Sequence, residues 1–197
     1  MNVILKMLAF VGFILLLPII VITMVIVIIE DGFPVLFVQK RLGKNKKIIT
    51  IYKIRTMKNT TPNLGTHEID NSYILKSSKF IRNLKIDELP QIINYLIGDL
   101  NIIGPRPGLP NQYDLINFRD KEKIFDITPG ITGLSQVLGY DMSNPELLSK
   151  IDKLYIENKS LKLDLMIFLS TFFPFLRKNI KIFFSHELKK LINLFEV

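Results

Sequence analysis

The chain has no cysteine and only two histidines, His67 and His186, among its 197 residues. Disulfide bonds and thiolate zinc sites are therefore excluded, and two histidines are too few for a histidine-rich metal site. A metal bound here would need hard oxygen ligands, as Mg²⁺ does. Acidic residues are also scarce, with 18 Asp and Glu against 26 Lys and Arg, which leaves a formal net charge of +8. That excess suits nucleic acid, anionic lipid head groups or a phosphorylated substrate.

Charge is missing altogether from residues 7–29, nearly all of which are Leu, Ile, Val, Phe or Met. A run of this length can cross a hydrocarbon core as a helix. It ends at Glu30 and Asp31 without the small-residue site of a cleaved signal peptide, so we expect it to be retained. Pro18, near its middle, removes a backbone donor and bends a helix. Two interpretations remain open: a bent helix that enters and leaves by one membrane face, and a kinked helix that spans the membrane.

The rest of the chain has neither internal repeats nor a dividing linker, which predicts one compact domain. Loose alternation predicts a short strand at residues 48–54, and Asn, Thr, Pro and Gly predict a surface loop at 58–72. Helical patterns occupy residues 77–83, 89–97 up to Gly98, 111–124 and 145–157. Gly and Pro predict a loop at 104–110 and a turn within 128–139. The apolar residues 161–176 suit either a membrane interface or ordinary core packing.

Asp87 and Glu88 stand before Pro90, at the start of the helix predicted for residues 89–97. Such residues commonly cap a helix, and a capping role would explain them without any catalytic function. A helix start also stabilises an anion, so an ionised and fixed Asp87 could attack phosphorus as a nucleophile. Neighbouring residues on a helix point in different directions, so the pair would divide two tasks, nucleophile and metal ligand. Arg82, five residues before Asp87, could reach the same site.

Arg106 stands between Pro105 and Pro107, and the two rings leave it little backbone freedom to lose on binding. Its guanidinium fork matches phosphate oxygens or a uracil edge, whereas the simpler interpretation is a turn with a solvated arginine. Lys53 and Arg55 alternate with apolar neighbours and would face one side of the predicted strand. They would form either a diphosphate clamp or an ordinary solvated face.

Several blocks, in order and at family-like spacing, together resemble the bacterial sugar transferase family, the monotopic phosphoglycosyl transferases. The blocks are residues 34–43 (PVLFVQKRLG), 52–57 (YKIRTM), 86–94 (IDELPQIIN), 98–99 (GD), 104–107 (GPRP), 129–137 (PGITGLSQV), 152–155 (DKLY) and 161–165 (LKLDL). Each block is weakly informative alone, whereas the ordered set, from about residue 30 to residue 171, is highly specific. Short stretches within 61–67 and 110–112 are similar to a subgroup of small members that make surface glycans.

The resemblance implies a mixed α/β fold, mostly α, with a short sheet and amphipathic interfacial helices. Residues 1–32 would form a re-entrant membrane helix, and residues 33–197 a small compact cytoplasmic catalytic domain. The protein would lie on the cytoplasmic face of the bacterial inner membrane, in contact with its lipid. It would have no nucleic-acid partner, and its oligomeric state, monomer or dimer, is left open.

The resemblance also implies a two-step exchange. Asp87 attacks the β-phosphate of a UDP-sugar, an N-acetylated hexosamine in the family-level expectation, and UMP leaves. Undecaprenyl phosphate then attacks the phosphosugar–aspartate, which is the first membrane step of surface glycan assembly. Asp87 and Glu88 are expected to hold Mg²⁺, and Arg106 to lie near the nucleotide. The other expected substrate-binding positions are Lys53, Arg55, Arg82, Pro105, Pro107 and Gln136.

Two positions depart from the family pattern. Leu17 precedes Pro18 where a serine is frequent, so the hydroxyl that could satisfy freed backbone groups is absent. Tyr140 follows Gly139 where an arginine is usual, so a phosphate contact is lost or replaced, which predicts lower activity or an altered substrate preference. Two alternatives remain: a membrane-tethered nucleic-acid-binding or scaffold protein, supported only by the net charge, and a membrane phosphohydrolase.

Overall fold

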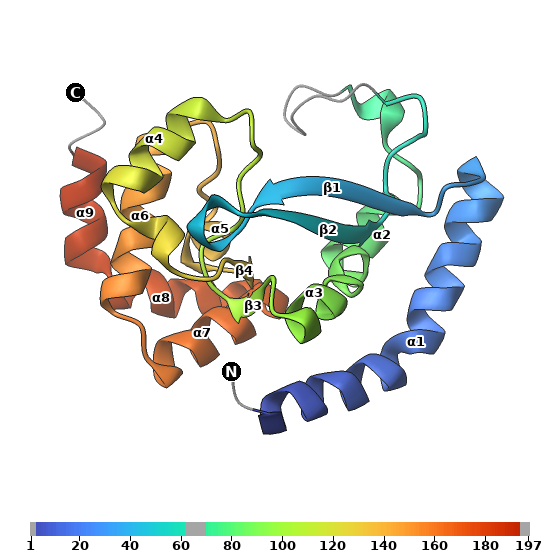
Figure 1. Cartoon of the computed structure of the whole chain (residues 1–197), viewed down its shortest axis with the longest axis horizontal. Helices are drawn as coiled ribbons and strands as arrows, with labels where there is room; N and C mark the ends of the chain where they lie inside the picture. Colours follow the sequence, from blue (N-terminus) through green and yellow to red (C-terminus); the bar gives the residue numbers. More distant parts are fainter. Residues whose placement is uncertain (1–2, 62–69, 194–197) are drawn as a thin grey trace. The chain divides into compact units, whose positions relative to one another are not determined.

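The computed structural model describes residues 3–61 and 70–193. The chain is mostly helical, with short strands, as the sequence predicts (Figure 1). It divides into two compact units, residues 1–39 with 50–97 and residues 40–49 with 98–197. The predicted boundary between a membrane helix (residues 1–32) and a catalytic domain (residues 33–197) depends on membrane insertion and stays a prediction.

The first unit begins with the long helix α1 (Val3–Asp31), which contains Pro18 and bends along its length (Figure 1). Most of its apolar side chains are exposed, and only Ile20, Thr23 and Val27 are buried. In the described part of the chain, α1 alone is long and apolar enough to cross a membrane. Exposed hydrocarbon on this scale is unfavourable in water, so a lipid environment is the simplest explanation.

A two-stranded sheet, β1 (Leu36–Leu42) and β2 (Ile48–Ile54), follows α1, and its residues 40–42 and 48–49 belong to the second unit. The remaining elements of the first unit are the 3₁₀ turn η3 (Asn71–Tyr73), α2 (Ser78–Asn83), the 3₁₀ turn η4 (Ile86–Glu88) and α3 (Gln91–Ile97). Ile20 and Val27 of α1 join Ile54, Leu75 and Ile81 in one buried apolar cluster. Helix α1 also packs against α3. One face of α1 is therefore part of the core of this unit.

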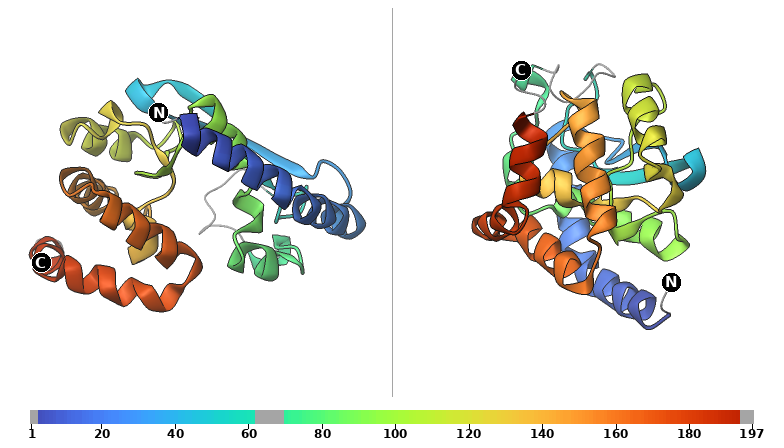
Figure 2. Two further views of the ribbon diagram at one scale, coloured as in Figure 1. Left: turned by 90° about the horizontal axis from the view of Figure 1, so that it is seen from below. Right: turned by 90° about the vertical axis from the view of Figure 1, so that its left-hand side faces the viewer.

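The second unit is built around a parallel pair of short strands, β3 (Asn101–Ile103) and β4 (Gly130–Thr132). Its helices are α4 (Tyr113–Lys121), α5 (Leu134–Leu138), α6 (Pro145–Glu157), α7 (Leu161–Phe172), α8 (Arg177–Phe183) and α9 (Ser185–Asn193), with 3₁₀ turns at Lys44–Lys46, Ile124–Asp126 and Pro174–Leu176. Helix α5 packs against α6, α7 and α8, and α9 packs against α6 and α8, in the yellow-to-red part of the ribbon (Figure 2). Their buried side chains, such as Ile151, Tyr155, Ile167 and Phe184, form the core of the unit.

Three glycines allow the backbone at β3 and β4 to approach closely. A Cβ on Gly130 would lie 2.1 Å from the amide nitrogen of Gly104, and a Cβ on Gly133 would lie 2.2 Å from the Gly104 carbonyl oxygen. The Gly104 amide donates to the Thr132 carbonyl at 2.9 Å, and the Gly130 amide donates to the Pro105 carbonyl at 2.9 Å. These contacts fix the base of the loop that carries Arg106.

Local patterns placed several elements correctly. The strand at 48–54 and the helix at 145–157 have the predicted bounds, and the helix before Gly98 ends there with φ +92°. Strand β4 and helix α5 were missed within the segment predicted only as a turn. Most of the predicted 58–72 loop lies outside the described residues. Of the apolar 161–176 segment, Leu163 and Ile167 are buried, as core packing requires.

Candidate active site

Asp87 lies in the 3₁₀ turn η4 (Ile86–Glu88), and α3 begins only at Gln91. The prediction that Asp87 caps this helix is therefore wrong. Pro90 has no amide hydrogen to donate back along a continuous helix, so the residues before it form a separate turn. Lys85 precedes this turn with φ +58°, in the left-handed region.

The Asp87 carboxyl group lies in an environment that disfavours its charge. The side chain is only 8% exposed, and its Oδ1 is buried without a hydrogen-bond partner. Burial raises the pKa of Asp87, and the nearby Glu88 raises it further, whereas Lys53, Lys85 and Arg82 act in the opposite direction. The sequence predicted the reverse, a carboxylate kept ionised by a helix start. The structure instead gives an aspartate whose pKa is raised, chiefly by its burial.

Two cationic side chains approach this carboxyl pair from other elements. Lys53 on β2 donates from Nζ to Oε1 of Glu88 at 2.7 Å, with the two side chains 20% and 12% exposed. Arg82 on α2 donates from Nε to Oγ1 of Thr56 at 2.9 Å. The structure thus brings together Lys53, Arg82, Asp87 and Glu88, although they come from three separate segments.

The two adjacent carboxylates suit a hard cation. No group of three or more Asp, Glu, His or Cys side chains that could hold a metal occurs in residues 3–61 and 70–193. The chain would therefore supply Asp87 and Glu88 at most from this site, and the buried, unpartnered Oδ1 of Asp87 provides an available oxygen. Mg²⁺ typically binds through one or two carboxylates together with substrate phosphates and water. The donor set matches that pattern.

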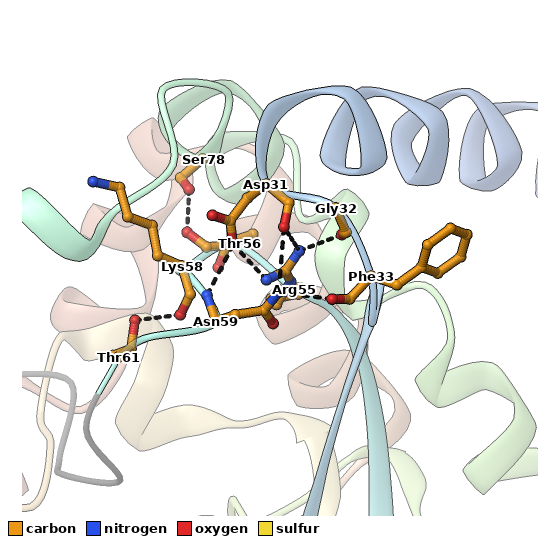
Figure 3. Close-up of polar contacts among 9 residues, drawn as sticks. All are labelled: Asp31, Gly32, Phe33, Arg55, Thr56, Lys58, Asn59, Thr61 and Ser78. Atoms are coloured by element: carbon orange, nitrogen blue, oxygen red, sulfur yellow. Dashed lines mark hydrogen bonds and ion pairs between the residues drawn. The ribbon is translucent and has the colours of Figure 1, made fainter.

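The predicted diphosphate clamp would need the guanidinium group of Arg55 to face a substrate, but in the structure this group bonds to residues at the end of α1 (Figure 3). Its guanidinium group, 6% exposed, donates to the carboxylate of Asp31 at 2.5 Å and to the carbonyl of Gly32 at 2.6 Å. Lys53 bonds to Glu88 instead. The two side chains therefore do not form a shared clamp in this structure, and a substrate contact by Arg55 stays a prediction.

The second unit contains Arg106, on the extended loop between β3 and α4. Arg119 donates from Nη1 to the Arg106 carbonyl at 2.7 Å and from Nη2 to Oδ2 of Asp152 at 2.5 Å. Ser135 donates to Oδ1 of Asp152 at 2.9 Å. Arg119 and Asp152 are 2% and 1% exposed. A buried charge network thus supports the loop from inside the unit.

Arg41 was not predicted as a functional residue, yet it lies at the same loop. It donates from Nη1 to the Pro107 carbonyl at 3.3 Å. Burial lowers the pKa of Arg41 to about 10, and the positive charges of Arg106 and Arg119 contribute in the same direction. No local pattern could reveal this contact, because Arg41 and Pro107 are 66 residues apart.

Of the other predicted binding residues in this unit, Pro105 and Pro107 form hydrogen bonds through their backbone carbonyls, and Gln136 lies on α5. The Pro105 carbonyl accepts from Gly130, and Pro107 accepts from Arg41. Gln136 on α5 donates to the Ile131 carbonyl at 3.4 Å, and its Oε1 is buried without a partner. Substrate contacts by these residues remain predictions.

Comparison with known proteins agrees with the family indicated by the motifs. Residues 2–178 match the model of the bacterial sugar transferase family. An uncharacterized sugar transferase of Bacillus subtilis is 38% identical over 149 residues, which cover 76% of this chain and 73% of that protein. A UDP-N-acetylgalactosamine-undecaprenyl-phosphate N-acetylgalactosaminephosphotransferase of Aeromonas hydrophila is 36% identical over 164 residues, 78% of this chain and 38% of that protein.

A UDP-glucose:undecaprenyl-phosphate glucose-1-phosphate transferase of Klebsiella pneumoniae is 37% identical over 163 residues, 74% of this chain and 34% of that protein. The chain thus matches little more than a third of the two relatives whose names state a reaction. The match of the family model nevertheless extends over most of this chain, including every block from the first strand to α7. The chain belongs to the bacterial sugar transferase family.

Proposed function

We propose that this protein transfers a phosphosugar from a UDP-sugar to undecaprenyl phosphate, releasing UMP and giving a polyprenyl-diphosphate-sugar. Family membership and the reactions named for the Aeromonas and Klebsiella relatives support this reaction class. The observation that carries the proposal is the buried Asp87 carboxyl with its unpartnered oxygen, beside the bonded pair of Glu88 and Lys53. A structural aspartate in such a position would be expected to have its hydrogen bonds satisfied.

In the first step, an oxygen of Asp87 attacks the β-phosphorus of the donor. The bond from that phosphorus to the bridging oxygen breaks, UMP leaves with the electron pair, and a phosphosugar–aspartate forms. Lys53 and Arg82 reduce the repulsion between the carboxylate and the diphosphate. The carboxylates of Asp87 and Glu88 would hold Mg²⁺, which when bound offsets the charge of the phosphate oxygens.

The raised pKa of Asp87 suits this sequence of events. Without a ligand, burial disfavours the charged carboxylate. Mg²⁺ held by Asp87 and Glu88 would favour the charged form of Asp87 and so oppose the effect of burial.

In the second step, a phosphate oxygen of undecaprenyl phosphate attacks the phosphorus of the intermediate. The bond from phosphorus to Asp87 breaks and restores the carboxylate, and a diphosphate linkage is formed. Departure of UMP before the acceptor enters means that the two anionic substrates never share the site. We propose an N-acetylated hexosamine as the transferred sugar, which agrees with the donor named for the Aeromonas relative.

Arg106 would bind the nucleotide portion of the donor. Its place between two prolines, and the bond from Arg119 to its carbonyl, hold the backbone of this residue in a fixed conformation. A preorganised guanidinium group loses little entropy on binding phosphate or a uracil edge.

The protein would bind one face of the bacterial inner membrane, with its catalytic part in the cytoplasm. Lys6, near the start of α1, donates to the Leu96 carbonyl at the end of α3 at 2.6 Å. Asp31, at the other end of α1, bonds to Arg55, the residue directly after β2. A straight spanning helix would separate Lys6 from Asp31 by about 38 Å across the bilayer. Two ends attached to the unit that carries Asp87 favour a re-entrant helix instead.

The second unit offers a further apolar surface for lipid. Leu161 and Phe175 are 89% and 75% exposed, and Phe172, Phe173 and Phe183 are also exposed. The basic residues Lys162, Arg177, Lys178 and Lys181 occur in the same segment. Exposed aromatic and aliphatic side chains with nearby basic residues are typical of a helix at an anionic membrane interface.

Trapping the intermediate tests the proposal. Purified protein incubated with Mg²⁺ and a panel of UDP-sugars, without acceptor, should gain the mass of one phosphosugar on Asp87 and release an equal amount of UMP. Asp87→Asn should form no adduct and lose all transfer, because an amide is a poor nucleophile. The exposed Asp114→Asn serves as the matched control and should retain both.

Other outcomes would identify the alternatives. An adduct on a different side chain, or an active Asp87→Asn protein, would refute the assignment. UMP release with free sugar phosphate at full rate in the absence of lipid would indicate a phosphohydrolase. A salt-sensitive DNA complex without turnover of any UDP-sugar would indicate a nucleic-acid-binding protein.

A further inference from the structure

The carboxyl-terminal end of α1 is bound tightly by Arg55 (Figure 3). Nη1 of Arg55 donates to Oδ2 of Asp31 at 2.5 Å, and Nη2 donates to the carbonyls of Asp31 at 3.1 Å and Gly32 at 2.6 Å. The last carbonyls of a helix have no partner within the helix, so a guanidinium fork at this place satisfies several at once. The chain turns away from the helix at Gly32, which has φ +66°.

Further bonds hold the same helix end. The Asn59 amide donates to Oδ2 of Asp31 at 2.8 Å, and Nδ2 of Asn59 donates to the carbonyls of Asp31 at 3.2 Å and Phe33 at 2.7 Å. The carboxylate of Glu30 accepts from Oγ of Ser77 at 2.6 Å and from the Ser77 amide at 3.3 Å. Two acidic residues at a helix carboxyl terminus are unfavourable alone, because the helix dipole is negative there. Their partners convert this end into an anchored point.

The end of β2 and the two residues after it connect this anchored point with the reacting group. Arg55 contacts the helix end, while Lys53, two residues earlier, bonds to Glu88. Thr56, the next residue after Arg55, accepts the bond from Arg82. Lys53, Arg55 and Thr56 lie within four consecutive residues, and consecutive Cα atoms are about 3.8 Å apart, so a short length of backbone links the exit of α1 to the carboxyl pair.

We propose that Arg55 is a positioning residue, which together with Asp31 and Asn59 locks the exit of the membrane helix to the segment directly after β2 and thereby sets the height of Asp87 above the bilayer. This inference rests on the proposed function, because height matters only if one substrate comes from the membrane. The donor is soluble and can approach freely, whereas the phosphate of a membrane lipid is confined to the interface. Loss of the lock should therefore impair use of the lipid acceptor selectively.

The test compares the two half-reactions in bilayer nanodiscs. Asp31→Asn removes the charge that Arg55 and Asn59 contact while retaining the shape of the side chain. Lys46→Met is the matched control, since it breaks an exposed ion pair of the same 2.5 Å length with Asp120, in the second unit. The measurements are the rate of adduct formation with donor alone, the KM for undecaprenyl phosphate in the bilayer, and the rate with a short, water-soluble prenyl phosphate.

For Asp31→Asn we expect the rate with the bilayer acceptor to fall on the order of 10- to 100-fold, since small displacements of reacting groups have effects of that size. The rates of adduct formation and of reaction with the soluble acceptor should stay within about twofold of the wild type, and Lys46→Met should change nothing. Adding Arg55→Met to Asp31→Asn should cause no further loss, because both changes break one lock. Equal loss in both half-reactions would overturn the proposal, as would no loss at all. If Arg55→Met raised the KM for the donor and Asp31→Asn did not, the result would indicate that Arg55 binds the substrate.

A second measurement requires no turnover. The chain has no cysteine, so Ile29→Cys, at a position 81% exposed, provides a single site for a fluorescent label. Quenching by lipids labelled at known depths should report one narrow depth, and Asp31→Asn should shift or broaden it. An unchanged depth would overturn the lock even in a protein that transfers sugar phosphate normally. A shifted depth in a protein that turns over no UDP-sugar would support the lock and refute the proposed function.

Discussion

Replacing Arg119 by methionine should destabilise the protein strongly, because it leaves the Asp152 carboxylate buried without its cation. Arg119 and Asp152 are 2% and 1% exposed, and Nη2 lies 2.5 Å from Oδ2. Among the described residues, the Asp152 carboxylate would retain the bond from Ser135, and the Arg106 carbonyl would lose the bond from Nη1. Arg119→Met retains the length of the aliphatic stem, so the main change is the loss of the charged donor group.

The size of the expected loss in stability follows from the burial of the Arg119–Asp152 ion pair. Removing one partner of a buried ion pair costs about 3–5 kcal/mol. For a domain of about this size, each kcal/mol lowers the unfolding midpoint by roughly 2–4 °C, so we expect a decrease of about 6–20 °C. The exposed pair of Lys46 and Asp120 has the same 2.5 Å separation but is 48% and 41% exposed. Breaking it by Lys46→Met should cost about 0–1 kcal/mol, and therefore no more than about 4 °C.

Thermal unfolding of the purified variants in one detergent measures both effects. The double variant with Arg119→Met and Asp152→Leu should recover much of the loss, because no uncompensated charge remains buried. Equal midpoints for Arg119→Met and Lys46→Met would refute the reasoning, as would a double variant no more stable than the single one. In the activity assay, Arg119→Met should raise the donor KM, since the Arg106 loop loses its support.

Three further predictions concern the carboxyl pair. Asp87→Asn should raise the midpoint of thermal unfolding at neutral pH, because burial raises the pKa of Asp87 and so disfavours its charged form. The protonated carboxyl group stabilises the folded protein fully below the ordinary pKa of 3.8, and this stabilisation is lost as the pH rises through the raised pKa. The gain should vanish near pH 3.8, and an unchanged midpoint at neutral pH would contradict the burial argument. Lys53→Met should shift the rise of adduct formation to higher pH, since Lys53 lowers the pKa of Asp87; a superimposable pH profile would exclude that influence. Glu88→Gln should increase the Mg²⁺ concentration needed for half-maximal rate, and an unaltered requirement would remove Glu88 from the metal site.

The sequence predicted those elements whose causes are local. Helix α6 has its predicted bounds because the Asn144 side chain accepts a bond from the Leu147 amide at 3.0 Å and Pro145 occupies the first turn. Strand β4 was missed because its three residues gain their partners only by pairing with β3, far earlier in the chain. Short strands of this kind leave too weak a periodic signal to be recognised.

In the candidate site too, features with a local cause were predicted and features set by tertiary packing were not. The pair Asp87 and Glu88 was singled out from its motif, and the structure places Lys53 against Glu88 and the charges of Lys53 and Arg82 near Asp87. The roles of these residues in the reaction stay predictions. The electrical environment of Asp87 was misjudged, since burial depends on the whole unit rather than on a helix start. The contacts of Arg55 with Asp31 are likewise set by tertiary packing and have no local signature.

The close backbone approach of three glycines at the base of the Arg106 loop restricts which substitutions this enzyme can accept. Gly104, Gly130 and Gly133 leave no room for even a methyl group, so almost any substitution there would separate the two strands before it could reshape the loop. Variation in nucleotide or sugar preference must therefore be sought at the rim of the loop and in neighbouring side chains. Directed evolution of donor choice should accordingly leave these three codons untouched.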